Sequence, residues 1–221
     1  MRVITLYEKG IQYSLALPNS EKDHLQRLIV NTNAPYELGM LRDIASRLCK
    51  DSVVLDVGAN IGNHSIYLAK VVGCRVVCFE PDKGLVDAIN FSAKENSIQD
   101  KIIIHNVAVG DTEGLCSLKM NPENPDSVGS QQVVVGQGDV PMITIDSLQL
   151  DRVDCMKIDV EGFEEQVLIG AIDTIKKTKP IIYVEAWNKE SLDKILKILK
   201  PLGYSAGKRF NATPTYILTT Q

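Results

Sequence analysis

The stretch Ser52-Val-Val-Leu-Asp-Val-Gly-Ala-Asn-Ile-Gly-Asn63 decides the fold class of this chain. Its first half is a short, almost continuous apolar run, which is typical of a strand buried on both faces of a parallel sheet. Gly58 and Gly62 allow the backbone to turn sharply and approach a ligand closely, and a helix that begins here would offer unpaired N–H groups. The stretch therefore predicts a strand, a glycine loop and a helix that together form one edge of a ligand site.

Further apolar runs of the same kind follow along the chain. They lie at 75–79, 101–107, 153–158 and 180–185, and segments with helical spacing follow the strands near 62–72, 83–96, 162–177 and 189–199. This alternation predicts a doubly wound α/β fold with right-handed crossovers and helices on both faces. Two more strands, at 203–209 and 215–220, extend the expected sheet to seven mostly parallel strands.

The residues ahead of this body form an expected N-terminal extension over 1–34. Residues 2–7 and 11–17 are typical of two strands of a hairpin around Lys9-Gly10, and residues 20–31 have helical spacing. The extension is therefore expected to consist of a hairpin and a helix.

The main domain, expected over 35–221, opens with a helix after Pro35 and contains an excursion over 111–148. The excursion is rich in Gly, Pro, Asn, Ser and Gln, so it is too polar for a core, and it is placed where a loop could cover a site. Acceptor specificity is expected here and in the terminal strands. Short β-like pieces of the excursion lie at 114–119, 132–135 and 141–145.

The amino-acid composition limits the classes of function that we expect for this chain. With 221 residues, 44% hydrophobic and 24% charged, the chain matches one globular domain with additions. The net charge is −4 and no Lys/Arg block is longer than a pair, so no nucleic-acid partner is expected. Five cysteines without a CxxC pair indicate neither a disulfide framework nor a zinc site, and they fit a cytoplasmic protein. No apolar run approaches the roughly 18 residues that span a bilayer.

Asp56 and Glu80 narrow the ligand class. Glu80 ends the second strand of the sheet, where an acidic side chain can accept hydrogen bonds from ribose hydroxyls. The spacing acidic-x-Gly-x-x-x-Gly is neither the dinucleotide fingerprint nor a P-loop. It is the form associated with S-adenosyl-L-methionine, because Asp56 suits that ligand's ammonium group, whereas a carboxylate would repel a pyrophosphate. The alternative is a tight turn whose glycines are only structural.

The chain carries five motifs in sequence: Asp56-Val-Gly-Ala-Asn-Ile-Gly62, Phe79-Glu80-Pro81, Asn106-Val-Ala-Val-Gly-Asp111, Thr144-Ile-Asp146-Ser-Leu148 and Lys157-Ile-Asp-Val-Glu-Gly-Phe-Glu164. In this order they resemble the motifs of FkbM-family methyltransferases. The resemblance covers about residues 35–190. It implies the class I methyltransferase fold, which is Rossmann-like, with S-adenosyl-L-methionine as cofactor and methylation of a hydroxyl on a sugar or a secondary metabolite.

The resemblance also implies roles for single residues. Gly58 and its loop would hold the methionine part of the cofactor, Glu80 the ribose, and the turn from Asn106 to Val109 the adenine edge. Glu37, beside Tyr36, is placed where it could form a lid over the methionine end. The full set of expected cofactor contacts is Glu37, Asp56, Gly58, Asn60, Gly62, Asn63, Glu80, Pro81, Asn106, Ala108, Val109 and Asp159.

Asp159 and Glu161 are the candidate catalytic residues, because they leave the carboxyl end of a buried strand and alternation aims them the same way. Methyl transfer requires a donor and a nucleophile about 3 Å apart in a water-poor pocket, and an alcohol must also lose its proton to a base. Asp159 is the first candidate for the base or for a substrate orienter, and Glu161 the second. Alternatively, one caps the next helix and the other binds only the cofactor ammonium. A metal held by the pair would need a third ligand, which the sequence does not place.

Weaker candidates lie nearby. Glu185, Trp187 and Asn188 follow the fifth strand on the same rim, where Trp187 could stack on a sugar or serve packing alone. His64 and His105 are alternative bases. The expected function is therefore an S-adenosyl-L-methionine-dependent O-methyltransferase that acts on a hydroxyl of a saccharide or a glycosylated small molecule. The alternatives are a small-molecule N-methyltransferase and a non-catalytic cofactor-binding module in a glycan-modifying assembly.

Overall fold

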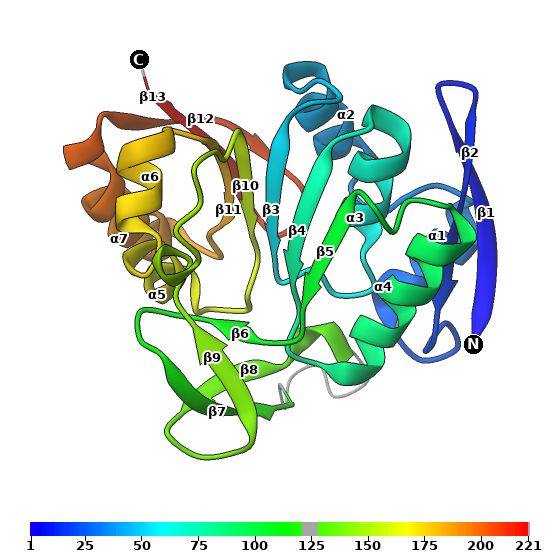
Figure 1. The fold of residues 1–221 in the computed structure, drawn as a ribbon, viewed down its shortest axis with the longest axis horizontal. Helices are drawn as coiled ribbons and strands as arrows, with labels where there is room; N and C mark the ends of the chain where they lie inside the picture. Colours follow the sequence, from blue (N-terminus) through cyan, green and yellow to red (C-terminus); the bar gives the residue numbers. More distant parts are fainter. Residues whose placement is uncertain (121–127, 221) are drawn as a thin grey trace.

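The computed structural model describes residues 1–120 and 128–220, and a seven-stranded sheet lies at the centre of this part (Figure 1). The strands β11, β10, β3, β4 and β5 run parallel in that order. The sheet is nevertheless mixed, because β13 is antiparallel to β11 and β12 is antiparallel to β13. A short turn joins β12 to β13, and a parallel pair would need a long crossover. The bounds are β3 (Val53–Val57), β4 (Arg75–Phe79), β5 (Ile102–His105), β10 (Cys155–Ile158), β11 (Ile181–Glu185), β12 (Tyr204–Phe210) and β13 (Thr215–Thr220).

Successive side chains of the central strands enter different cores. In β3, Val54 packs into one core, whereas Leu55 and Val57 pack into the other. Helices thus cover both faces of the sheet, as the continuous apolar runs predict. The first core includes α2 (Leu38–Arg47), α3 (Asn63–Tyr67) and α4 (Lys83–Glu95), and the second includes α5 (Glu164–Ile169), α6 (Ile172–Thr178) and α7 (Lys189–Leu199).

β1 (Arg2–Glu8) and β2 (Ile11–Leu17) form the predicted hairpin, which packs against α4 and does not join the central sheet. The backbone N–H groups of Ser14 and Ala16 donate to side chains at the end of α4, so the edge of β2 is covered. The helix predicted over 20–31 is α1 (His24–Thr32), and its predicted start is wrong. It begins later because the Asp23 carboxylate caps it, accepting a 3.0 Å hydrogen bond from the N–H of Gln26.

The single helix predicted over 162–177 is divided into α5 and α6. Gly170, between them, lies against the carbonyl of Gly110, where a Cβ would come within 1.9 Å of the oxygen. Asp146 then caps α6, because its carboxylate accepts hydrogen bonds from the first N–H groups of that helix. The motif around Asp146 therefore has a structural role.

The helix predicted over 62–72 is α-helical only in α3. From Leu68 to Val72 it widens into a π-helical turn, and the N–H groups of Gly73 and Cys74 both donate to the carbonyl of Leu68. Gly73 has a φ of 90°, a left-handed conformation that ends the helix.

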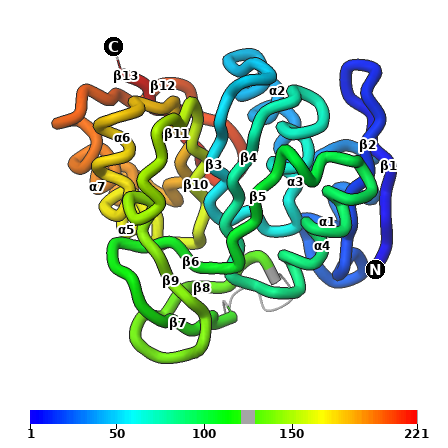
Figure 2. Tube along the Cα trace, viewed as in Figure 1, coloured from blue at the N-terminus to red at the C-terminus, as the bar shows by residue number. Residues whose placement is uncertain are grey.

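The excursion after β5 folds into a second sheet, in the order β6-β9-β7-β8, around a small core of Ala108, Cys116 and Met142. The predicted β-like pieces are confirmed as strands, although the last one ends at Ile143; residues 121–127 of the excursion lie outside the described residues. Figure 2 shows this second sheet beneath the lower ends of β4 and β5. Its bounds are β6 (Ala108–Val109), β7 (Gly114–Lys119), β8 (Gln132–Val135) and β9 (Val140–Ile143).

None of the helices within 1–120 and 128–220 is long and apolar enough to cross a membrane. The cysteines are free thiols; Cys49 is exposed and the other four are buried.

Candidate functional site

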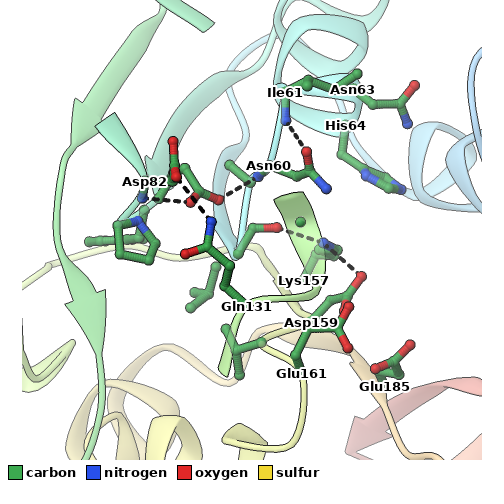
Figure 3. A pocket seen from close by; sticks show the side chains of 18 of the residues that line it. Asn60, Ile61, Asn63, His64, Asp82, Gln131, Lys157, Asp159, Glu161 and Glu185 are labelled. Carbon is green, nitrogen blue, oxygen red and sulfur yellow. Dashed lines mark hydrogen bonds and ion pairs between the residues drawn. The ribbon is translucent and has the colours of Figure 1, made fainter. Parts of the chain in front are cut away.

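A pocket of about 250 Å³ opens at the carboxyl ends of β3, β4, β10 and β11, where the sequence predicts a ligand crevice (Figure 3). Asp82 and Gln131 lie at one end, which we call the insertion end because Gln131 belongs to the excursion. Glu80 lies at the same end, because its carboxylate accepts from the N–H of Asp82. Asp159, Glu161 and Glu185 lie at the other, which we call the acidic end. The glycine loop lies between the two ends.

Gly58 and Gly62 shape this loop. Both have a φ near 80°, which favours glycine, and Asn60 between them is also left-handed at 53°. A Cβ on Gly58 would lie 1.8 Å from the backbone oxygen of Asp159, so only glycine allows the loop to contact the chain after β10. The close approach that the sequence predicts is therefore toward this neighbouring backbone.

The N–H groups of residues 58–62 all have partners inside the protein, whereas the unpaired N–H groups predicted for the start of the helix that follows stay a prediction. The first two donate to the carbonyl of Phe79, and the last donates to the carbonyl of Ala59. The N–H of Asn60 donates to Glu80 Oε2 at 2.7 Å, and that of Ile61 to Asn60 Oδ1 at 2.7 Å. This segment therefore offers no nest for a phosphate.

Glu80 is buried beneath the loop, and each of its carboxylate oxygens accepts one backbone N–H bond. Oε2 accepts from Asn60, and Oε1 accepts from Asp82 at 2.9 Å. Burial raises the pKa of Glu80 to about 7, although these backbone bonds oppose the shift. Asn106, predicted at the adenine edge, instead donates from Nδ2 to the carbonyls of Glu80 and Pro81, so it braces this turn.

The excursion closes the insertion end. Gln131 Nε2 donates to Asp82 Oδ2 at 3.0 Å, which ties the second sheet to the start of α4. Gly129 approaches the loop so closely that a Cβ there would lie 2.0 Å from Asn60 Nδ2. Leu118 and Val133 add apolar wall. The described part of the excursion therefore covers the Glu80 end, away from the acidic end.

Lys157, near the end of β10, joins its own strand end to β3 and the glycine loop. Its Nζ donates to the carbonyl of Gly58 at 3.1 Å and lies 3.3 Å from Asp159 Oδ2 and 3.7 Å from Asp56 Oδ1. Burial lowers the pKa of Lys157, but the carboxylates of Asp159, Asp56 and Glu37 outweigh burial and raise it. Asp56 is fully buried and accepts a 2.6 Å hydrogen bond from Ser65 Oγ, so it holds Lys157 from behind the pocket wall.

Glu161 and Glu185 face the acidic end with raised pKa values. Burial raises the pKa of Glu161 to about 7, and Asp159 and Glu164 add to the shift. Burial, followed by repulsion from Asp159, also raises the pKa of Glu185. Glu161 has a φ of 56°, and the turn around it is held by Glu164 Oε1, which accepts from the N–H groups on either side of it. Glu164 therefore takes the structural role considered for Asp159 or Glu161.

Glu37 and His64 close the pocket between the acidic end and α2. Their side chains are buried, and His64 Nε2 lies 3.2 Å from Glu37 Oε2 without hydrogen-bond geometry. Asn63 Oδ1 accepts from the N–H of Tyr36 at 3.0 Å and its Nδ2 donates to the Tyr36 carbonyl, so the glycine-loop helix fixes this segment. Glu37 thus lies at the pocket, where the sequence predicts a lid.

The structure brings most of the predicted site residues together at this pocket. Three expected cofactor contacts do not line the pocket: Asp56, Gly62 and Asn106. Among the weaker candidates, Glu185 and His64 line the pocket, whereas Asn188 caps α7 and His105 stacks on Phe79 with ring centroids 5.1 Å apart. The residues that do line it are Glu37, Gly58, Asn60, Asn63, Glu80, Pro81, Ala108, Val109, Asp159 and Glu161.

Sequence reasoning assigned no role to Lys157, Asp82 or Gln131. A lysine within a buried strand is a signal that could have found Lys157, because a buried cation needs anionic partners. Gln131 and Asp82 meet only through the fold of the excursion, so no local pattern indicates them.

Carboxyl groups outnumber basic groups in the lining of the described pocket. Lys157 is its one lysine, against six carboxyl groups: Glu37, Glu80, Asp82, Asp159, Glu161 and Glu185. Burial raises the pKa of Glu80, Glu161 and Glu185, so only part of this set is fully ionised near neutral pH. A cleft with this balance concentrates cations and repels anions. Within the described residues, no group of three or more His, Cys, Asp or Glu side chains is placed to hold a metal ion.

Comparisons with known proteins identify a family and a fold. A model of the methyltransferase FkbM domain matches residues 56–206, more than half of the chain. The chain is also 27% identical over 175 residues to the 2-O-methyltransferase NoeI of Sinorhizobium fredii (strain NBRC 101917 / NGR234). This match covers 67% of this chain and 69% of NoeI.

Solved structures share the fold. The crystal structure of methyltransferase FkbM from Methylobacillus flagellatus KT matches with a TM-score of 0.60 and 22% identity, over 78% of this chain and 44% of that one. The chain thus spans less than half the length of that protein. The structure of P. horikoshii TYW2 in complex with MeSAdo matches with a TM-score of 0.55 and 16% identity, over 98% of this chain and 69% of that one.

Proposed function

The chain belongs to the FkbM methyltransferase family, and on this basis we propose that it transfers a methyl group from S-adenosyl-L-methionine to a hydroxyl of a saccharide or a glycosylated small molecule. The name of NoeI, a 2-O-methyltransferase, supports a hydroxyl as the acceptor. The MeSAdo bound by TYW2, which shares the fold, supports a ligand of the S-adenosyl type.

The observation that carries the proposal is the excess of carboxyl groups around a glycine loop without free N–H groups at 58–62. A dinucleotide or a nucleoside triphosphate would meet repulsion here and would find no phosphate nest on this loop. S-adenosylmethionine has a sulfonium and an ammonium group and no phosphate. Its charges therefore match the pocket.

The insertion end suits the nucleoside. Each Glu80 oxygen accepts one backbone N–H, so lone pairs remain for ribose hydroxyls. Leu118 and Val133 offer apolar surface to a purine ring, and Gln131, held by Asp82, can hydrogen-bond to its edge. Asp56 does not line the pocket, so Glu37 and Asp159 are the better candidates to receive the ammonium group.

The acidic end suits the methyl acceptor. When bound, S-adenosylmethionine supplies a methyl group on a positively charged sulfur. Asp159 is held by Lys157 at 3.3 Å and serves as the orienter, whereas the Glu161 carboxylate makes no hydrogen bond or ion pair with the described residues. Because its pKa is raised to about 7, Glu161 can take the proton of an acceptor hydroxyl near neutral pH. A nearby cation would favour its ionised form.

An amine acceptor is the alternative, and the acidic end would attract it. The same carboxylates would, however, stabilise the ammonium form, which has no lone pair for attack. A hydroxyl stays neutral there and meets carboxylate acceptors for its proton.

Isotope transfer tests the proposal. The protein, incubated with methyl-labelled S-adenosylmethionine, should label members of a panel of methyl glycosides and of simple amines. Label in glycosides supports O-methylation of saccharides, and label in amines alone supports the alternative. Cofactor binding without any labelled acceptor would favour a non-catalytic module and contradict the proposal.

A further inference from the structure

Trp187 lies between β11 and α7 with 44% of its surface exposed, although an indole ring is largely apolar. Its Nε1 donates a 2.7 Å hydrogen bond to Oε2 of Glu185, a buried residue that lines the pocket. An exposed aromatic side chain is thus tied to a carboxyl group of the acidic end.

The position of the ring is fixed from a second side. A Cβ on Gly162 would lie 3.4–3.9 Å from three carbons of the six-membered ring, so the indole rests on this glycine. Gly162 directly follows Glu161, and Figure 3 shows Glu161 and Glu185 at the same end of the pocket. The indole therefore bridges the two strand ends that carry these acids.

We propose that Trp187 is the platform on which the acceptor's sugar ring stacks, beside the carboxyl groups that receive its hydroxyls. This proposal rests on the proposed function and names the group that would recognise its substrate. The apolar C–H face of a sugar covers an indole well, while hydroxyls at the ring's edge need hydrogen-bond acceptors. Glu185, which accepts from the indole Nε1, and Glu161, which precedes the glycine that the ring contacts, supply such acceptors beside the platform. A phenol would stack as well, but it has a single hydroxyl for these acceptors.

The Trp187 indole is held in place before a sugar binds, so it loses little conformational freedom on binding. The hydrogen bond from Nε1 and the contact with Gly162 restrict the indole before any ligand arrives. Such preorganisation favours binding because less side-chain entropy is lost. The tie also explains how a large apolar ring is kept at the surface.

The chain contains one tryptophan, so its fluorescence reports directly on this platform. The full-length protein, saturated with the demethylated cofactor S-adenosylhomocysteine so that no turnover occurs, is titrated with methyl glycosides of common hexoses, deoxyhexoses and hexosamines. We expect at least one glycoside to change the emission saturably and to lower quenching by acrylamide about twofold or more. A panel without any effect, or an effect from phenols or amines alone, would overturn the proposal.

Variants separate the platform from the cofactor site. Trp187→Leu should raise KM for the responding glycoside roughly 3- to 10-fold, and Trp187→Phe should raise it less, because the phenyl ring keeps an aromatic face. The Kd for S-adenosylmethionine should stay within about twofold. Tyr7→Leu removes an exposed aromatic ring from the hairpin and serves as the matched control, with no change in KM expected.

Two results distinguish a failure of the Trp187 proposal from a failure of the proposed function. Loss of S-adenosylmethionine binding in Trp187→Leu would mean that the indole only supports the fold, which would overturn the platform. If the wild-type protein binds glycosides at Trp187 but does not bind S-adenosylmethionine, the role of Trp187 in sugar binding is supported and the proposed methyltransferase function is contradicted.

Discussion

Lys157 is the residue that connects the pocket's parts, because one buried ammonium contacts the loop after β3 and two carboxylates. A buried ion pair adds little net stability, but removing one partner leaves an uncompensated charge. The arrangement therefore makes the contact between β10 and the segment of β3 and the glycine loop depend on one side chain.

We predict that Lys157→Met destabilises the fold by about 3–5 kcal/mol, because the fully buried Asp56 then lacks its cation. The double variant Asp56→Asn/Lys157→Met should recover a large part of this loss, since no isolated charge remains beside Ser65. Urea unfolding of both variants measures the difference. Equal stability of the single and double variants would show that the ion pair has no such role.

Glu161 and Asp159 should respond differently to loss of charge. Glu161→Gln should lower the single-turnover rate roughly 10²- to 10⁴-fold with little change in cofactor Kd, because it removes the base. Asp159→Asn should weaken cofactor binding and turnover together, since Asp159 faces Lys157 and the expected ammonium site. Calorimetry and rapid-quench methyl transfer, made on the same samples, measure both quantities. Asp159 would instead be the base if Glu161→Gln left turnover unchanged and Asp159→Asn greatly lowered turnover without weakening cofactor binding.

The raised pKa of Glu161 also makes a stability prediction. Burial moves this pKa from 4.5 to about 7 in the folded protein, so the stabilising contribution of the protonated carboxyl is present below pH 4.5 and lost as the pH rises through 7. Glu161→Gln should therefore match the wild type near pH 4.5 and exceed it above pH 8 by on the order of 1–3 kcal/mol. Denaturant unfolding at both pH values tests this, with the exposed Glu95→Gln as control. A variant less stable than wild type at pH 8 would contradict it.

At the scale of elements, the second sheet covers the insertion end and leaves the acidic end to the turn between β12 and β13 and the segment before α2. The described part of the excursion lies at the end where we propose the nucleoside, and the sequence-based expectation that the excursion sets acceptor specificity stays a prediction. The terminal strands remain candidates, because Thr213 between β12 and β13 lines the pocket.

Gln131 tests this division of roles. Gln131→Ala removes the bond to Asp82, so the Kd for S-adenosylmethionine should rise roughly 3- to 10-fold, while KM for a glycoside acceptor should change less than twofold. Steady-state kinetics at saturating concentrations of the other substrate separate the two constants. A change confined to the acceptor KM would place acceptor recognition in the excursion after all.

The strands and the glycine loop could be predicted because their signals are local: apolar runs buried on both faces and glycines at left-handed positions. The break between α5 and α6 could not, since it depends on contact between Gly170 and Gly110, far apart in sequence. The same limit applies to the site. Asp56 was expected in the pocket because it precedes the loop, but Ser65 and Lys157 draw it behind the wall.

At the scale of the whole molecule, the net charge of −4 is modest, yet six carboxyl groups gather at one pocket. The doubly wound topology makes this possible, because the parallel strands end at one edge and each can deliver an acidic residue there. The hairpin and α1 share a core with the sheet and bring His24 and Leu25 to the pocket rim. The pocket's carboxyl groups therefore come from the sheet edge and from Glu37 before α2, whereas the described part of the excursion lines the pocket with uncharged residues.

Calorimetry with S-adenosylmethionine, NAD and ATP tests the central claim most directly, namely that this pocket accepts a phosphate-free cationic nucleoside. We predict saturable binding of S-adenosylmethionine, no response to NAD or ATP, and a loss on the order of 1–3 kcal/mol in Glu80→Ala, which lacks the carboxylate for the ribose. Tight binding of NAD or ATP without any response to S-adenosylmethionine would contradict the claim.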